Sequence, residues 1–170
     1  MKIFLTNLGK YNEGELIGEW VELPASNEEL QEVFDRIGIN EEYEEYFITD
    51  YECDFYKVGE YDNLDELNEI AEQIEELNEE ESDVVKALIS SEFGYTLDEA
   101  IEKANNGDYR IYYDCENMED VAYQVVDECG YFENTPDIVA NYFDYKSFGR
   151  DLEIEGRYIF LDDRKVIEIC

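Results

Sequence analysis

"NEEYEEYFITDYECDFY", residues 40–56, combines strand-forming aromatic side chains with uncompensated negative charge. It contains seven carboxylates, six aromatic rings and no basic residue. From residue 47 the pattern has a period of two, which is typical of a strand with one buried face. The residues expected to face a core are Phe47, Thr49, Tyr51, Cys53 and Phe55. The residues expected to face outward are Ile48, Asp50, Glu52, Asp54 and Tyr56.

The residues before this segment complete a small sheet. "KIFLTNLG" (2–9) and "ELIGEWVELP" (15–24) have strand composition and are separated by the turn signal "NEG". "SNEELQEVFDRIG" (26–38) opens with an S-x-x-E capping box and predicts a helix. The sole tryptophan, Trp20, is expected to pack between sheet and helix. Residues 1–61 are therefore predicted to form a three-stranded antiparallel sheet plus a helix.

The chain then changes to helical periodicity. "DNLDELNEIAEQIEELNEE" (62–80) places its apolar residues on one face with a period of 3.6. "SDVVKALISSEFG" (82–94) and "TLDEAIEKANNG" (96–107) predict two shorter helices, the second with a T-x-x-E capping box. Residues 62–107 are therefore predicted to form a small helical module.

The last third mixes both periodicities. "DYRIYYDC" (108–115) predicts a strand, and "ENMEDVAYQVVDECG" (116–130) predicts a helix with an asparagine N-cap. "TPDIVANYF" (135–143) predicts a further helix capped by its threonine, and "GRYIFLDDRKVIEIC" (156–170) a hairpin around Asp162–Asp163. The predicted fold is α+β, with three small domains at 1–61, 62–107 and 108–170, in which small antiparallel sheets flank the helical module.

Composition excludes several classes of function. The four cysteines form no C-x-x-C pair and the chain has no histidine, so we expect no metal site and no Ser–His nucleophile. The thiols, Cys53, Cys115, Cys129 and Cys170, are expected to be reduced and mostly buried. No glycine-rich phosphate-binding motif is present. We therefore expect no cofactor and no enzymatic activity.

The net charge of −35 comes from 47 acidic and 12 basic residues. It argues against binding to nucleic acid or to anionic membranes. No apolar run reaches about 18 residues, and we expect neither a signal peptide nor a membrane span. A cytoplasmic protein is expected. A hydrophobic fraction of 44% and an aromatic fraction of 15% favour a folded core over disorder.

Long segments of the chain contain acidic residues without basic residues between them. Residues 58–85 contain twelve carboxylates and no basic residue. Like charges three or four residues apart on a helix cost about 0.2–0.5 kcal/mol per pair. Duplex DNA carries one charge per ~1.7 Å, so 35 charges match the phosphates on ~60 Å of duplex, and that density favours an elongated array of modules.

Three alternatives are open at this point. Calcium buffering normally uses an EF-hand loop, which is absent. Halophilic adaptation would give a similar composition. A carboxylate-pair enzyme such as a glycosidase has 47 candidate carboxylates, so no pair is distinctive.

Three segments resemble the ArdA antirestriction family: "NLGKYNEGELIGEW" (7–20), "INEEYEEYFITDYE" (39–52) and "NYFDYKSFGRDL" (141–152). Their order and spacing also agree. The resemblance implies a mimic of bent B-form DNA, carried by conjugative plasmids and transposons. Such a mimic occupies the DNA-binding groove that the specificity and modification subunits of type I restriction–modification enzymes form. It also implies three domains in a line and a homodimer joined through the C-terminal domain.

On this interpretation, one face of the acidic segments imitates a phosphate row. The phosphate-mimic candidates are Asp50, Glu52, Asp54, Asp62, Asp65, Glu66, Glu69, Glu72, Glu75, Glu76, Glu79 and Glu80. The candidates for the dimer contact are Tyr142, Phe143, Tyr145 and Phe148. The family's antirestriction motif is placed on "DVAYQVVDECGYF" (120–132). Val121, Val125, Tyr131 and Phe132 in it are open to either role, motif or core, and core is the expected role of the two valines. Arg150 is expected to pair with a neighbouring acid.

A protein from another class remains the alternative. It would be an acidic interaction protein for a different basic DNA-binding partner, such as a nucleoid protein.

Overall fold

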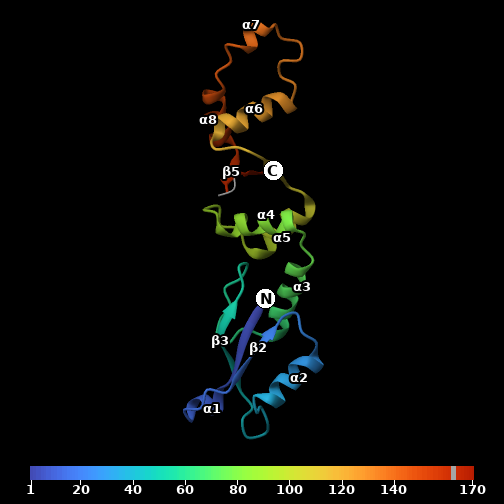
Figure 1. Cartoon of the computed structure of the whole chain (residues 1–170), viewed down its shortest axis with the longest axis vertical. Helices are drawn as coiled ribbons and strands as arrows, with labels where there is room; N and C mark the ends of the chain where they lie inside the picture. Colours follow the sequence, from blue (N-terminus) through green and yellow to red (C-terminus); the bar gives the residue numbers. More distant parts are fainter. Residues whose placement is uncertain (162–163) are drawn as a thin grey trace. The chain divides into compact units, whose positions relative to one another are not determined.

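The computed structural model describes residues 1–161 and 164–170. The chain divides into two compact units, Met1–Ser82 and Asp83–Cys170, and the boundary falls inside α4 (Glu79–Ser90). Each unit contains a three-stranded antiparallel sheet together with helices (Figure 1), which confirms the predicted α+β class. The division into three domains stays a prediction.

The sheet of the first unit consists of the three strands expected from the sequence. They are β1 (Lys2–Asn7), β2 (Gly18–Glu22) and β3 (Tyr46–Glu52), in the order β2-β1-β3. The first predicted strand was too long, because residues 8 and 9 belong to a short helix, α1 (Leu8–Asn12). This helix begins where the Asn7 side chain accepts a hydrogen bond from the Lys10 backbone N–H. A local side-chain cap therefore ends the strand.

A bulge in β3 overturns part of the predicted alternation. Phe4 pairs with Asp50 but the next residue, Leu5, pairs with Ile48, so Thr49 is the extra residue. Ile48 is consequently buried in the core, at 3% exposure, whereas Thr49 is exposed. The predicted orientations of these two residues were wrong, because a bulge shifts which side chains reach each face. For the same reason Phe47 lies on the opposite face of the sheet from Tyr51, although both were expected to face one core.

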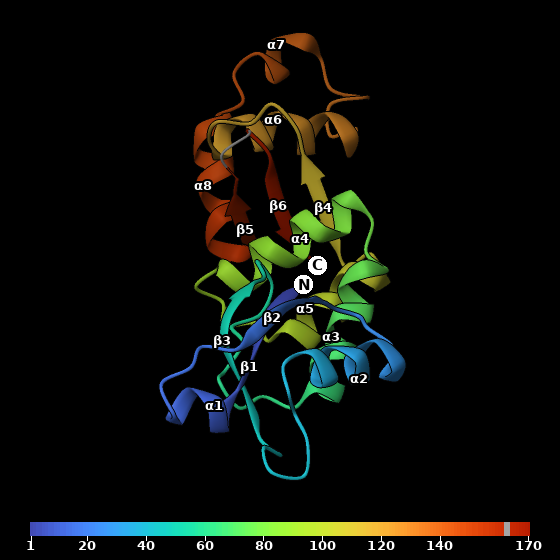
Figure 2. The ribbon, with the colours of Figure 1, turned by 60° about the horizontal axis from the view of Figure 1, so that its bottom comes forward.

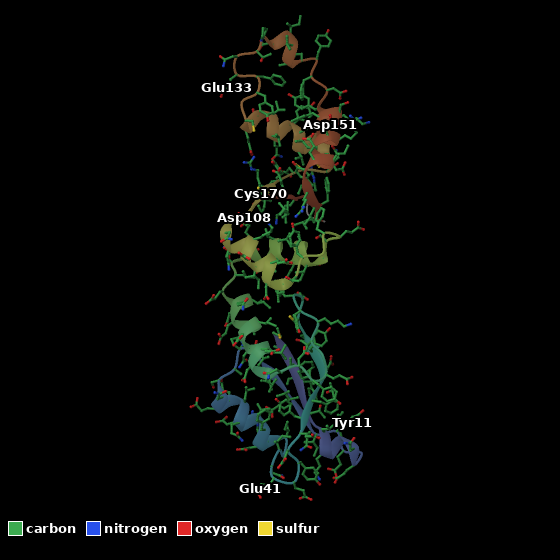
Figure 3. All side chains as sticks on the ribbon, turned by 180° about the vertical axis from the view of Figure 1, so that it is seen from behind. Tyr11, Glu41, Asp108, Glu133, Asp151 and Cys170 are labelled. Atoms are coloured by element: carbon green, nitrogen blue, oxygen red, sulfur yellow. The ribbon has the colours of Figure 1, made fainter. Side chains whose placement is uncertain are left out.

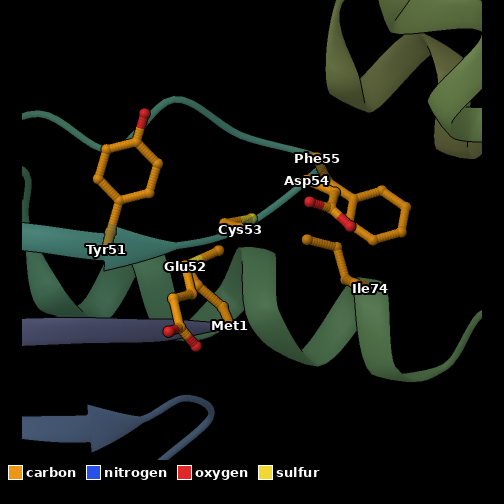
Figure 4. Close-up of a pocket in the computed structure, with 7 residues that line it drawn as sticks. All are labelled: Met1, Tyr51, Glu52, Cys53, Asp54, Phe55 and Ile74. Carbon is orange, nitrogen blue, oxygen red and sulfur yellow. The ribbon is translucent and has the colours of Figure 1, made fainter.

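The predicted alternation also ran past the end of the strand. β3 stops at Glu52, and Cys53, Asp54 and Phe55 follow in irregular backbone. Figure 4 shows these residues around a cavity that Met1 and Ile74 also line. Tyr56, which was expected to face outward, packs against the core. Asp54 therefore does not continue the strand row of Asp50 and Glu52.

Two helices cover one face of this sheet, α2 (Asn27–Arg36) and α3 (Leu64–Glu75), and Figure 2 shows both on the same side. The predicted capping box is present, and the Ser26 backbone N–H lowers the pKa of the Glu29 carboxyl. The core residues of this unit are Ile3, Leu5, Val21, Leu23, Leu30, Val33, Ile37, Ile48, Val58, Leu64, Leu67 and Ala71. Trp20 is not among them, so the prediction that it packs between sheet and helix was wrong.

The second unit contains β4 (Tyr109–Tyr112), β5 (Arg157–Phe160) and β6 (Val166–Ile169), in the order β4-β6-β5. The predicted C-terminal hairpin is confirmed, since β5 and β6 pair antiparallel. The turn residues predicted for it, Asp162–Asp163, lie outside the described residues.

Four helices of this unit follow the start of α4. They are α5 (Leu97–Asn106), α6 (Met118–Glu128), α7 (Asp137–Ala140) and α8 (Tyr145–Glu155). The capping box on α5 and the asparagine cap on α6 are confirmed. The threonine cap on α7 was wrong, because Pro136 occupies the N-cap position without a side-chain hydrogen bond.

Helices α6 and α8 approach each other closely at Gly149. A Cβ added there would overlap the backbone carbonyl of Met118. Phe148 and Leu152, on either side of this glycine, pack against the core that Val121 and Val125 help to form. The glycine of "SFGRD" therefore sets the distance between the two helices.

The four cysteines are free thiols, as expected. Only part of the burial prediction is correct. Cys115 is buried and Cys53 half-buried, whereas Cys129 and Cys170 are exposed, because they lie just after the ends of α6 and β6.

Two tyrosines share one carboxylate in the sheet of the second unit. Tyr112 and Tyr158 donate hydrogen bonds to Glu168, at 2.7 and 2.8 Å. Burial, and then these hydrogen bonds, raise the pKa of both phenols above their ordinary value. Unfolded tyrosines ionise at about pH 10. The contribution of these two phenols to the free energy of unfolding should therefore be fully present below about pH 10. It should fall above that pH, where the unfolded chain releases protons that the folded chain retains.

Tyr112→Phe is expected to lower the free energy of unfolding by about 1–2 kcal/mol at neutral pH, because Glu168 loses one donor. It should also weaken the fall above about pH 10, because one shifted phenol is gone. Urea unfolding at several pH values measures both effects, with the exposed Tyr142→Phe as the control. If the free energy of unfolding of the variant falls above pH 10 as steeply as that of the wild type, this explanation is contradicted.

Candidate functional site

A continuous set of exposed carboxylates lies on the solvent face of α3 and the start of α4. The apolar stripe of α3 faces inward, and its residues Leu64, Leu67 and Ala71 lie in the core of the first unit. All the predicted carboxylates on these helices are exposed: Asp65, Glu66, Glu69, Glu72, Glu75, Glu76, Glu79 and Glu80. Figure 3 shows side-chain oxygens spread over the outside of both units.

Some of these carboxylates have a local structural explanation. Asp65 and Glu66 lie in the first turn of α3, and Glu79 and Glu80 in the first turn of α4. Negative charge at a helix N-terminus is stabilised by the helix dipole and by free backbone N–H groups. These four positions would therefore be acidic in many ordinary helices.

The remainder of α3 lacks this stabilisation of negative charge. Four glutamates, the acidic quartet, follow that first turn: Glu69 in the middle of the helix, Glu72 and Glu75 in its last turn and Glu76 at the C-cap. The helix dipole disfavours negative charge in the last turn. The last turn contains no basic residue. Within residues 1–161 and 164–170, none of the quartet forms an ion pair. No described residue pairs with this charge, so a role outside the fold is its best explanation.

The candidates on and after β3 are more dispersed. Asp50 and Glu52 are exposed on the face of the sheet away from the helices, where Glu52 is the cross-strand partner of Lys2. Asp62 is half-buried, and its carboxylate accepts the Gly59 backbone N–H at 2.8 Å. Because this hydrogen bond holds a turn, Asp62 has a structural role that the sequence pattern did not indicate.

Basic residues are largely paired with nearby acids. Arg36 contacts Glu19 at 2.9 Å, and this contact lowers the pKa of the Glu19 carboxyl. Arg150 pairs with Asp151 at 2.8 Å, which confirms its expected role. The other cations in such pairs are Lys10, Arg110, Arg164 and Lys165. Local pairing therefore further reduces the positive charge that the chain presents to solvent.

The "DVAYQVVDECGYF" motif lies mainly on α6. Val121 and Val125 are buried, at 0% and 8% exposure, which confirms them as core residues. Tyr131 is 55% exposed, and Phe132 meets Phe143 edge to face at 5.2 Å. The motif thus combines a buried helix face with an exposed aromatic end.

The four dimer candidates have two different environments. Phe143, Tyr145 and Phe148 are half-buried in one aromatic cluster, with centroid distances of 4.9 Å (143–145) and 5.5 Å (143–148). Tyr142 lies outside that cluster and is 86% exposed. Of the four, Tyr142 is the side chain available for contact with another molecule.

No cluster of three or more metal-binding side chains occurs among the described residues. None of the helices in that part of the chain is long and apolar enough to cross a membrane.

Residues 3–166 match the family model described as antirestriction protein (ArdA). The chain belongs to the ArdA antirestriction family. Membership supports an antirestriction function and an interaction with restriction enzymes. A search of curated proteins gave no significant match. In this ArdA-family chain, Glu52 lies opposite Lys2 and Asp50 accepts the Tyr51 backbone N–H at 2.8 Å. The acidic quartet is the group of exposed candidates for which the described residues give no structural reason.

Proposed function

We propose that the protein inhibits type I restriction–modification enzymes as a decoy for DNA and is not itself an enzyme. It would occupy the groove in which the specificity and modification subunits hold the duplex. The observation that carries this proposal is the acidic quartet, whose charge destabilises its own helix and has no partner in the described fold. A basic groove evolved to hold phosphates would relieve that repulsion on binding.

The charge of the whole chain supports the same mechanism. A net charge of −35 equals the phosphate charge on ~60 Å of duplex. We propose further that two copies associate through the C-terminal region, with Tyr142 in the contact. Two copies would carry 2 × 35, or about 70, charges. Sedimentation of the protein measures this association.

Protection of unmodified DNA tests the function. Cells that contain a type I system should lose most of their restriction of unmodified phage when they produce the protein, and cells with the system deleted should show no change. Purified enzyme should also stop cleaving unmodified plasmid when the protein is present in slight excess. Full restriction in the presence of folded protein, across several type I enzymes, would refute the proposal.

A further inference from the structure

The sheet of the first unit has a second face that neither α2 nor α3 covers. An aromatic groove of about 470 Å³ lies on it, formed chiefly by Phe4, Tyr11, Trp20 and Phe47, with Leu16, Asp50 and Glu60 at its edges. Tyr11 reaches this groove from α1 (Figure 3). The sequence pattern pointed to Trp20 as a core residue and did not indicate this groove.

The groove exposes much of its apolar lining to solvent. Leu16 is 69% exposed, Tyr11 50% and Trp20 43%. Tyr61, stacked on Phe47 at 6.3 Å, is 72% exposed. Single exposed apolar residues are normal, but a contiguous group of this kind marks an interaction site.

Ring contacts hold the groove in one arrangement. Phe4 and Trp20 meet edge to face at 5.3 Å, and Tyr11 and Phe47 at 5.1 Å. Gly18 of β2 permits this packing, because a Cβ there would meet the Phe4 ring and the Leu5 carbonyl. The aromatic faces are therefore positioned before any partner arrives, which lowers the entropic cost of binding.

The chemistry of the lining indicates a cationic occupant. Asp50 and Glu60 place two carboxylates at the aromatic groove, and no lysine or arginine is among the described residues that line it. Lys2 lies on the same face of β1, but its cross-strand partners are Glu22 and Glu52. A second copy of this chain is a poor occupant, because it would bring a further net charge of −35 against these carboxylates.

We propose that the aromatic groove binds an arginine side chain on the DNA-binding surface of the inhibited enzyme. A guanidinium group is weakly hydrated, stacks on aromatic faces and pairs with carboxylates in a planar geometry. Trp20 would supply the aromatic face, since tryptophan is the strongest cation–π partner, and Asp50 or Glu60 the carboxylate. This inference rests on the proposed function and adds to it a contact that DNA itself does not offer.

Trp20 allows a direct test, because it is the only tryptophan in the chain. Tryptophan can be replaced during expression by its mono-, di- and trifluorinated forms, which keep the shape of the ring and progressively weaken its attraction for cations. Affinity for a type I methyltransferase core should fall stepwise with fluorination, by about 5- to 30-fold in total. Unchanged affinity across the series would overturn the inference.

A second label reports burial in the complex. 5-Hydroxytryptophan at position 20 can be excited where ordinary tryptophan does not absorb, so the enzyme contributes no signal. Acrylamide quenching of this label should fall severalfold in the saturated complex, and unchanged quenching would overturn the inference. Leu16→Ala should weaken binding, and the control Ile154→Ala, 74% exposed on α8, should not. If the wild-type protein forms no complex at all, the proposed function itself fails, which distinguishes the two outcomes.

Discussion

Replacing Glu69, Glu72, Glu75 and Glu76 together by glutamine is expected to weaken inhibition strongly and to stabilise the protein. Four exposed ion pairs with the enzyme, at about 0.5–1 kcal/mol each, give a loss of about 2–4 kcal/mol. This corresponds to a roughly 30- to 1,000-fold weaker apparent affinity. Competition against labelled duplex measures the change.

The stability change should have the opposite sign. Glutamine and glutamate have nearly equal helix propensities, so the substitution mainly removes repulsion between neighbours on α3. Five close pairs lose their repulsion, 65–69, 66–69, 69–72, 72–75 and 72–76. At about 0.2–0.5 kcal/mol each, they predict a gain of about 1–2.5 kcal/mol in the free energy of unfolding. Urea unfolding measures this gain.

A matched control separates the acidic quartet from charge in general. Glu41, Glu42, Glu44 and Glu45 are also exposed glutamates of the first unit, but they lie in irregular backbone and outside the predicted phosphate row. Their fourfold replacement by glutamine makes the same change in net charge and should weaken inhibition much less. Equal losses for the two variants would show that net charge alone acts. An unchanged affinity for the quartet variant would remove its proposed role.

The second large effect is expected in the second unit. Gly149→Ala should lower the free energy of unfolding by about 1–3 kcal/mol, because the added methyl group overlaps the Met118 carbonyl and forces α6 and α8 apart. Helix propensity alone predicts the reverse, a gain of about 1 kcal/mol. Thermal and urea unfolding therefore distinguish the two effects by sign.

Glu153→Ala, at an exposed position of the same helix, is the control for helix propensity and should change stability little. If Gly149→Ala proves as stable as the wild type or more so, the two helices can separate without cost. Gly149 would then not be needed for the close approach of α6 and α8.

The sequence allowed good prediction wherever a local signal decides the structure. The capping boxes at Ser26 and Thr96 correctly marked the starts of α2 and α5. The 3.6-residue stripe through Leu64, Leu67 and Ala71 correctly separated the buried face of α3 from its acidic face. These features depend on residues within a few positions of one another, so a single sequence contains them.

The predictions were wrong where contacts between residues far apart in the sequence determine the structure. The bulge at Thr49 depends on how β3 pairs with β1, and periodicity along β3 alone cannot show it. Trp20 lies on the uncovered face because its cross-strand partner, Phe4, points there. The close approach at Gly149 requires knowledge that α6 and α8 are neighbours.

The same distinction applies to the candidate site. Exposure of the acidic helix face followed from its spacing, but the half-buried, hydrogen-bonded state of Asp62 and the irregular backbone at Asp54 did not. The alternation that predicted a phosphate row at residues 50, 52 and 54 ends with β3 at Glu52. The structure thus shifts the emphasis toward α3.

Displacement of DNA is the most direct test of the decoy mechanism. A type I methyltransferase core is bound to labelled duplex that contains its recognition site, and the protein is titrated in at low and at moderate salt. We expect near-stoichiometric protein to displace the duplex, and displacement to weaken as salt rises because the contacts are ionic. Folded protein that leaves the duplex bound to several such enzymes at both salt concentrations would contradict it, and the acidic surface would then belong to another basic partner.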